Sequence, residues 1–208
     1  MAAERRIEMP IKAERQYRSM MMSAQPEKEK LIDSEYYVEG YAANYERYRL
    51  WGYDDDAVYE QFRKENFEGV DLSDVIMQYD HMGDVFARTK NGTLIVRVDE
   101  KGLLVAADLG QTQRGREIYE MIAKGMVDKM SWSFIPEDGY FDEATRTITY
   151  SRIRKIFDVS AVSIPANDTT DIHARSYVDG VISKAAQERR RRDKIRLQIK
   201  IKTGGIRL

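Results

Sequence analysis

The chain has 208 residues, of which 42% are hydrophobic and 10% aromatic, and its formal net charge is −1. This composition is typical of a globular protein with one sizeable core, and it excludes a mostly disordered chain. There is no cysteine, the apolar stretches are short and interrupted by charge, and the N-terminus lacks an apolar leader. We therefore expect a soluble, non-secreted protein of a reducing compartment, with no disulfide framework and no membrane contact.

The charge is unevenly distributed along the chain. Residues 181–208 hold ten basic side chains and two acidic ones, a net charge of +8, so the remainder carries −9. This basic segment predicts either an electrostatic partner, namely an acidic protein surface or nucleic acid, or a solvated charged helix. Apolar and polar residues alternate over residues 195–201, so an edge strand is a further alternative there.

The predicted elements begin after a charged, methionine-rich segment over residues 1–30, which we interpret as a flexible N-terminal arm. Residues 36–42 are aromatic and β-branched, which predicts a strand, and residues 45–51 are a second extended piece. Three acids at 54–56 predict the start of a helix that ends near residue 66.

The next region is predicted to be a meander of strands. A short apolar run over residues 75–79 ends at Asp80 and His81. Asn91 and Gly92 favour a hairpin between strands at residues 85–89 and 93–98. A second turn at residues 100–102 leads into a third strand at 103–107.

A helix is predicted over residues 112–124, because apolar residues recur at helical spacing and Gly125 stands at the C-terminal cap position. The remaining strands are predicted over residues 130–135, 147–153 and 156–164, with a turn at Asp138 and Gly139. Many short strands with helices between them indicate a mixed sheet or barrel, not a parallel βαβ array. A helix at residues 178–192 begins a basic C-terminal tail over 178–208.

Three separated segments carry candidate chemistry. They are residues 79–83 with His81, residues 129–134 with Ser131 and Ser133, and residues 156–160 with Asp158. A serine hydroxyl becomes a good nucleophile when a base takes its proton, and the base acts best when a third group orients it. The chain has two histidines, His81 and His173, so few bases are available.

The two serines belong to a strand-like stretch. Alternation places Ser131 and Ser133 on one face of it, and Met130, Trp132 and Phe134 on the other. The large side chains would anchor the strand in a core, while the hydroxyls face a groove or a neighbouring strand.

These motifs, in this order and spacing, closely resemble the prohead (capsid maturation) proteases of tailed bacteriophages, which are serine proteases related in fold to the herpesvirus assemblins. The resemblance runs from about residue 36 to about residue 166. It implies an α+β fold with a mixed or antiparallel β-barrel-like core and surrounding helices, the assemblin-like arrangement. The serine protease domain is then expected over residues 31–177.

The resemblance also implies the roles of the site residues. Ser131 is expected to be the nucleophile, His81 the base and Asp158 the orienting acid, although the phage family usually has Glu at the position of Asp158. Ser133 competes as nucleophile, but we favour a small polar residue packed beside the site. His173 is the rival third member, because the herpesvirus relatives use a second histidine. We expect His81 and Ser131 on adjacent strands, about 2.6–3.2 Å apart.

The implied function is that of a serine endopeptidase which cleaves scaffold and capsid-protein extensions, and itself, during prohead maturation. It would act in the host bacterial cytoplasm inside the assembling procapsid, encoded by a phage or a prophage. The alternative is a catalytically inactive assembly or scaffolding protein that binds partners through the basic tail. A homodimer is a further option, because the assemblin relatives are often active as dimers.

We expect no metal and no cofactor. Two histidines without cysteine do not make a common zinc site unless several carboxylates join them, and no His-Glu-x-x-His pattern occurs. The glycines at residues 110–115 lack the Lys-Ser/Thr ending of a phosphate-binding loop.

Overall fold

The computed structural model of the chain describes residues 6–9, 15–23, 29–163 and 191. The chain divides into two units, Met1–Thr170 and Asp171–Leu208, and all described residues except Arg191 belong to the first. The predicted tail helix, the alternating segment at residues 195–201 and His173 lie outside the described residues.

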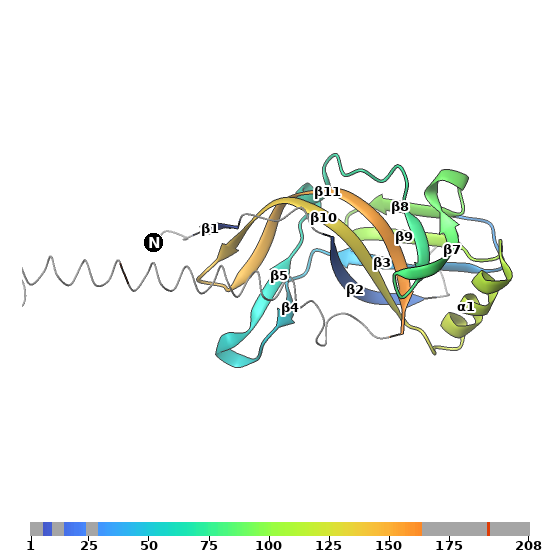
Figure 1. Ribbon diagram of the computed structural model, residues 1–208, viewed down its shortest axis with the longest axis horizontal. Helices are drawn as coiled ribbons and strands as arrows, with labels where there is room; N and C mark the ends of the chain where they lie inside the picture. Colours follow the sequence, from blue (N-terminus) through green and yellow to red (C-terminus); the bar gives the residue numbers. More distant parts are fainter. Residues whose placement is uncertain (1–5, 10–14, 24–28, 164–190, 192–208) are drawn as a thin grey trace, which may run out of the picture. The chain divides into compact units, whose positions relative to one another are not determined.

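The described chain consists mainly of strands (Figure 1). The strands are β1 (Arg6–Met9), β2 (Gln16–Ser23), β3 (Tyr37–Asn44), β4 (Tyr48–Trp51), β5 (Val58–Gln61), β6 (Ile76–Tyr79), β7 (Met82–Arg88), β8 (Leu94–Val98), β9 (Gly102–Asp108), β10 (Lys129–Asp142) and β11 (Thr147–Val162). The helix α1 spans Gln113–Ala123, and three short 3₁₀ helices are η1 (Asp54–Asp56), η2 (Lys64–Phe67) and η3 (Thr89–Asn91).

These strands form one mixed sheet in the order β4-β5-β11-β10-β2-β3-β9-β8. Outside this path, β6 pairs with β11 and β7, and β1 pairs with β10. The long, curved β10 and β11 lie side by side through the middle of the molecule (Figure 1). The predicted mixed core is therefore found. Between the described strands no pairing closes the sheet into a barrel, and residues 29–163 contain one α-helix where the resemblance implies several surrounding helices.

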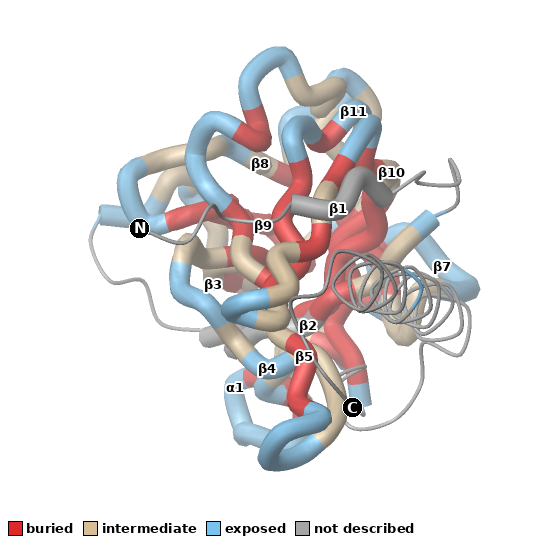
Figure 2. The backbone as a smooth tube through the Cα atoms, turned by 90° about the vertical axis from the view of Figure 1, so that its left-hand side faces the viewer, coloured by how far each residue is buried: buried red, intermediate tan, exposed pale blue. Residues whose placement is uncertain are grey.

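The core lies against one face of β10. Trp132 and Phe134 are fully buried and stack at 4.2 Å between ring centroids, and Phe62 packs on both at 5.3 and 5.6 Å. Figure 2 shows buried stretches running through the sheet strands, with exposed ones gathered in the connecting turns. A one-residue slip of β10 would exchange these rings with Ser131 and Ser133, whose face is also buried and holds His81 and Asp158, so the large rings would be overpacked there. The register of β10 is therefore firmly fixed.

The predicted helix at residues 112–124 is confirmed as α1. The Thr112 hydroxyl accepts a hydrogen bond from the Gly115 amide at 2.9 Å, which caps the N-terminus. Ile118 and Ile122 are buried, and Gly125 has a φ of +68° just beyond the last turn.

The helix predicted over residues 54–66 is wrong. The acids form the short η1, and the chain then continues as β5 and η2. Val58, Glu60 and Phe62 are buried and alternate with half-buried neighbours, a period of two that fits a strand. The acids at the start are compatible with a helix, but the burial pattern that follows them is not.

The predicted hairpin at Asn91 and Gly92 is also wrong in its pairing. Both flanking segments are strands, yet β7 pairs with β6 and β8 pairs with β9, because η3 separates them. The turn predicted at Asp138 and Gly139 lies inside β10, where the ladder with β11 shifts register. The two strands predicted from residue 147 onward are one continuous strand, β11, up to Val162.

Residues 16–23 fall in the segment that the sequence analysis interprets as an arm. They form β2, which lies between β10 and β3 in the sheet. Arg18 on β2 is 3% exposed and pairs with the buried Glu60 of β5. The sequence pattern does not indicate this strand, because Glu60, the residue that pairs with its buried Arg18, is 42 residues away in the chain.

Candidate active site

The face of β10 opposite the core carries Ser131 and Ser133. Their hydroxyls contact His81 and Asp158, respectively, while the rings of Trp132 and Phe134 stack on the other side. The predicted alternation is therefore confirmed. Ser131 is 1% exposed and Ser133 is fully buried, so both hydroxyls need partners within the fold.

Asp158 reaches this face through a β-bulge in β11. Ser133 pairs with Asp158 and Phe134 pairs with Ile156, so Phe157 is an extra residue on β11. In an uninterrupted strand, Asp158 would point to the same side as Ile156, which is the core side. The bulge therefore places the carboxylate beside the serines.

His81 occupies a tight two-residue turn between β6 and β7. Tyr79 pairs with Met82 across it, and Asp80 and His81 have φ values of +47° and +59°. Two positive φ angles are the signature of a type I′ hairpin, and Asp and His tolerate this conformation better than most residues. The expectation of adjacent strands is wrong: β11 lies between β6 and β10, and His81 reaches across it to Ser131.

Asp80 fixes this turn to the end of β11. Its amide donates to the Ala161 carbonyl at 2.9 Å, and its carboxylate accepts hydrogen bonds from the Ser163 amide and hydroxyl, both at 2.9 Å. From the sequence, Asp80 is interpreted as an ordinary surface acid at a strand end, with a supporting role for His81 as the less favoured alternative. An acid directly before a histidine at the end of a short strand is the signal that could have indicated it.

The imidazole of His81 joins the serine to the acid. Its Nε2 lies 2.6 Å from Ser131 Oγ, and its Nδ1 lies 2.5 Å from Asp158 Oδ1. The Ser131 distance falls within the expected range. The side chain of His81 is 18% exposed, so of the three residues it is the one that solvent reaches most readily.

The carboxylate of Asp158 is 1% exposed and surrounded by donors. Burial alone would raise its pKa, but hydrogen bonds from His81, Ser133 and Ser160 outweigh this and lower the pKa below its ordinary value. Arg15 Nη1 lies 3.9 Å from Oδ2 and adds a favourable charge. Asp158 is therefore an anion at neutral pH, which suits a group that stabilises an imidazolium.

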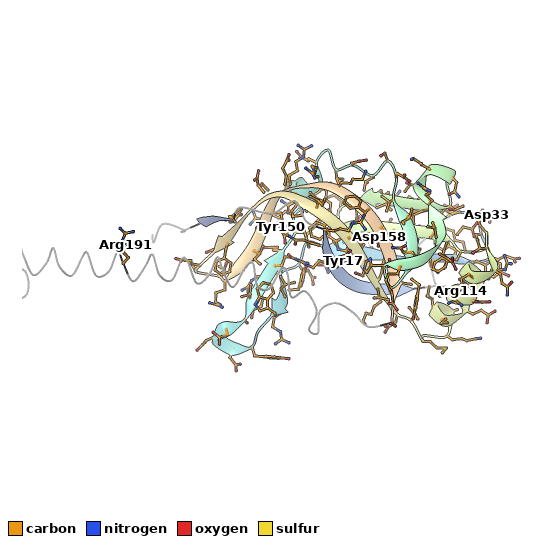
Figure 3. All side chains as sticks on the ribbon, in the orientation of Figure 1. Tyr17, Asp33, Arg114, Tyr150, Asp158 and Arg191 are labelled. Atoms are coloured by element: carbon orange, nitrogen blue, oxygen red, sulfur yellow. The ribbon has the colours of Figure 1, made fainter. Side chains whose placement is uncertain are left out.

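The strand β2 and Arg15, the residue before it, contribute contacts that were not predicted from the sequence. The Tyr17 ring meets the His81 ring edge-on, with 4.5 Å between centroids, and the Arg15 guanidinium lies 4.1 Å from the Phe157 centroid. In Figure 3 the labelled Tyr17 and Asp158 come from β2 and β11, the two neighbours of β10. Composition and periodicity in residues 1–30 contain no signal for these contacts.

The competing residues have different positions. Ser133 Oγ donates to Asp158 Oδ2, whereas Nε2 of His81 is in contact with Ser131. His173 lies outside the described residues. Within the described part of the chain, no cluster of three or more His, Cys, Asp or Glu side chains could hold a metal ion, and no helix there is long and apolar enough to span a membrane.

A comparison with known families agrees with this geometry. Residues 24–181 match the family described as caudovirus prohead serine protease. The matched range begins just after β2 and includes His81, Ser131 and Asp158. No curated protein and no solved structure matches the chain. The match spans most of the sequence, and a serine, a histidine and an acid in one hydrogen-bonded series are the residues that such chemistry requires. The chain therefore belongs to the caudovirus prohead serine proteases, a family of phage capsid maturation.

Proposed function

We propose that this chain is a serine endopeptidase in which Ser131 is the nucleophile, His81 the general base and Asp158 the orienting acid. The observation that carries the proposal is the unbroken hydrogen-bonded series, 2.6 Å from Ser131 to His81 and 2.5 Å from His81 to Asp158. The family supplies the reaction class, and the geometry supports the assignment of roles.

In the neutral imidazole, Nδ1–H donates to Asp158, which leaves the lone pair of Nε2 to accept the Ser131 proton. As Ser131 Oγ attacks the carbonyl carbon of the substrate, that proton moves to Nε2 and the buried carboxylate stabilises the imidazolium. His81 then gives the proton to the leaving amine nitrogen. The acyl group remains on Ser131 as an ester.

The second half of the reaction uses the same groups. His81 takes a proton from water, the resulting hydroxide attacks the ester, and the carboxylic acid product leaves as Ser131 regains its proton. Asp158 need not be protonated at any step, which agrees with its lowered pKa.

The substrates that the family implies are capsid or scaffold proteins of the phage. We propose that extensions of these proteins are cut inside the procapsid in the host cytoplasm, and that the chain also cuts itself near its ends. Exposed segments near chain ends are frequent sites of cleavage. The homodimer, the contacts of the basic tail and the assemblin-like barrel stay predictions.

The proposal is tested with purified protein and a fluorophosphonate probe, which reacts with activated serines. Wild-type protein should be labelled on Ser131, and Ser131→Ala and His81→Gln should not. Removal of the nucleophile should lower kcat on a procapsid-protein substrate by roughly 10⁶-fold. Mass spectrometry should find self-trimmed species in the wild type that are missing from Ser131→Ala.

An absence of serine reactivity and self-trimming would favour the alternative function, that of a catalytically inactive assembly protein. If wild-type and Ser131→Ala proteins are equally unreactive, equally intact and equally able to support capsid maturation, the chain is a catalytically inactive assembly protein. A labelled Ser131 with identical masses in both proteins would instead exclude only self-processing.

A further inference from the structure

We infer that Ser133 and Ser160 are positioning residues, which together hold the Asp158 carboxylate in the orientation that His81 requires. The inference rests on the proposed triad and extends it to the groups behind the acid. It also gives Ser133 a role other than that of a second nucleophile.

Three side chains donate to the two oxygens of Asp158. His81 Nδ1 at 2.5 Å and Ser160 Oγ at 2.9 Å share Oδ1, while Ser133 Oγ donates to Oδ2. Ser133 and Ser160 are fully buried, and Asp158 is 1% exposed. A carboxylate with both oxygens engaged cannot rotate about its last bond without breaking a charge-assisted hydrogen bond.

The register of the two central strands brings these groups together. Ser131 pairs with Ser160, and Ser133 pairs with Asp158, so the four side chains form a compact group on one face of β10 and β11. Directly opposed residues of an antiparallel pair have Cβ atoms about 4.5–5.5 Å apart, which a hydroxyl and a short carboxylate can bridge. The bulge at Phe157 is what gives Asp158 this partner.

The two serines also account for the short acid at this position. Glutamate is the other acidic side chain that could stand at this position. Aspartate has one methylene fewer than glutamate, so its carboxylate stays closer to the backbone of β11. To contact His81, this carboxylate must be held in one orientation. Ser133 and Ser160 fix that orientation from the neighbouring strand and from two residues along the same strand.

The groups around Asp158 determine its pKa, which can be measured. His81 contacts it from the β6–β7 turn, Arg15 Nη1 lies 3.9 Å from Oδ2, and Tyr17 packs on the His81 ring from β2. The serine hydrogen bonds favour the ionised carboxylate, so their removal raises the pKa of Asp158. The carboxyl resonance of Asp158, followed by NMR, should then titrate at higher pH in variants that lack these hydroxyls.

The test compares Ser133→Ala and Ser160→Ala with Ser133→Thr, which retains a hydroxyl on a strand-compatible side chain. Each alanine variant should lower kcat about 10- to 100-fold with little change in KM, and should raise the pKa of Asp158. Ser133→Thr should recover most of kcat. Ser34→Ala is the matched control, because it also removes a serine hydroxyl that donates to an aspartate, Asp108, at 2.5 Å, and it should keep wild-type kinetics.

The outcomes separate this inference from the proposed function. If Ser131→Ala is inactive and Ser133→Ala and Ser160→Ala keep wild-type kcat and an unchanged pKa of Asp158, the positioning role is wrong and the triad stands. If Ser131→Ala retains labelling and turnover while Ser133→Ala loses both, Ser133 is the nucleophile and both statements fail. Where Ser133→Ala does not fold, as judged by circular dichroism, Ser160→Ala decides by the same criteria.

Discussion

The guanidinium of Arg18 on β2 and the carboxylate of Glu60 on β5 form a buried, two-pronged ion pair. Nε lies 2.5 Å from Oε2 and Nη2 lies 2.6 Å from Oε1, and the two residues are 3% and 0% exposed. The Tyr48 and Tyr150 hydroxyls donate to the same carboxylate. The strand that carries Tyr17 to His81 is thus held by a polar network within the core.

Breaking this pair from one side should strongly destabilise the fold. Glu60→Leu leaves the Arg18 charge buried without its counter-ion, for which about 3–5 kcal/mol of unfolding free energy is expected to be lost. Urea unfolding followed by tryptophan fluorescence measures this. The double variant Arg18→Met with Glu60→Leu removes both charges and should be more stable than Glu60→Leu alone; a double variant that is equally or less stable would contradict the argument.

Stability should fall in strongly alkaline solution. Burial raises the pKa of Tyr37 and of Tyr45 to about 12, from 10.0, and raises the pKa values of Tyr48 and Tyr150 well above 10.0. Since the unfolded phenols ionise first, the stabilisation is complete below pH of about 10 and is lost as pH rises toward 12 and above. The free energy of unfolding should decline across this range.

Tyr48→Phe isolates the contribution of one phenol. A phenylalanine cannot ionise, so the variant should have a smaller decline in unfolding free energy between pH 10 and 12 than the wild type. Parallel curves for the two proteins would show that other groups cause the alkaline loss.

The bulge in β11 should be essential for activity. Deleting Phe157 restores strict alternation, which turns either Asp158 toward the core or Ile156 away from it. We expect activity to fall to the level of Ser131→Ala. Phe157→Ala keeps the extra residue and loses only the contacts with Arg15 and Lys155, so it should retain most of the turnover. Equal activity of the two variants would mean that the bulge does not orient the acid.

The features that were predictable from the sequence are those with local signals. The alternation around Ser131 and the capped helix α1 follow from side-chain size and spacing within a dozen residues. The β2 strand and the bulge at Phe157 were not predictable, because each depends on a partner strand elsewhere in the chain. The pairing of β7 with the preceding β6 was not predicted because Asp80 and His81 are not a common hairpin sequence, whereas Asn91 and Gly92 are. Asn91 and Gly92 illustrate the limit: a turn sequence fixes the local backbone, but it does not choose which strands pair.

The hydrogen bonds between Asp80 and Ser163, which hold the turn that carries His81, should affect turnover. Asp80→Gly removes both acceptors for Ser163 while tolerating the positive φ, so the turn is released and kcat should fall about tenfold. Asp80→Asn keeps an oxygen acceptor and should lose less. Asp84→Gly, an exposed change on β7, is the control for added backbone freedom. Matching losses in Asp80→Gly and Asp84→Gly would assign the effect to flexibility alone.

Asp158 itself should be required for fast turnover. Asp158→Asn preserves the shape of the side chain but removes the charge that stabilises the imidazolium and selects its tautomer. By analogy with the best-studied triad, kcat should drop by up to about 10⁴-fold while the protein remains folded. Kinetics on a peptide substrate and circular dichroism check the two parts. Undiminished cleavage would remove Asp158 from the triad and make His173 the candidate for the third position.

Asp158→Glu tests whether the surroundings are built for the shorter acid. The site between Ser133 and Ser160 is fully buried, so an added methylene must push the carboxylate away from both hydroxyls or strain the strand. We expect a loss of activity smaller than that of Asp158→Asn, because the charge remains. Adding Ser133→Gly to Asp158→Glu makes room and should recover part of the loss, whereas Ser133→Gly alone should lower kcat. If Asp158→Glu has wild-type kcat, the two serines do not select for aspartate at this position.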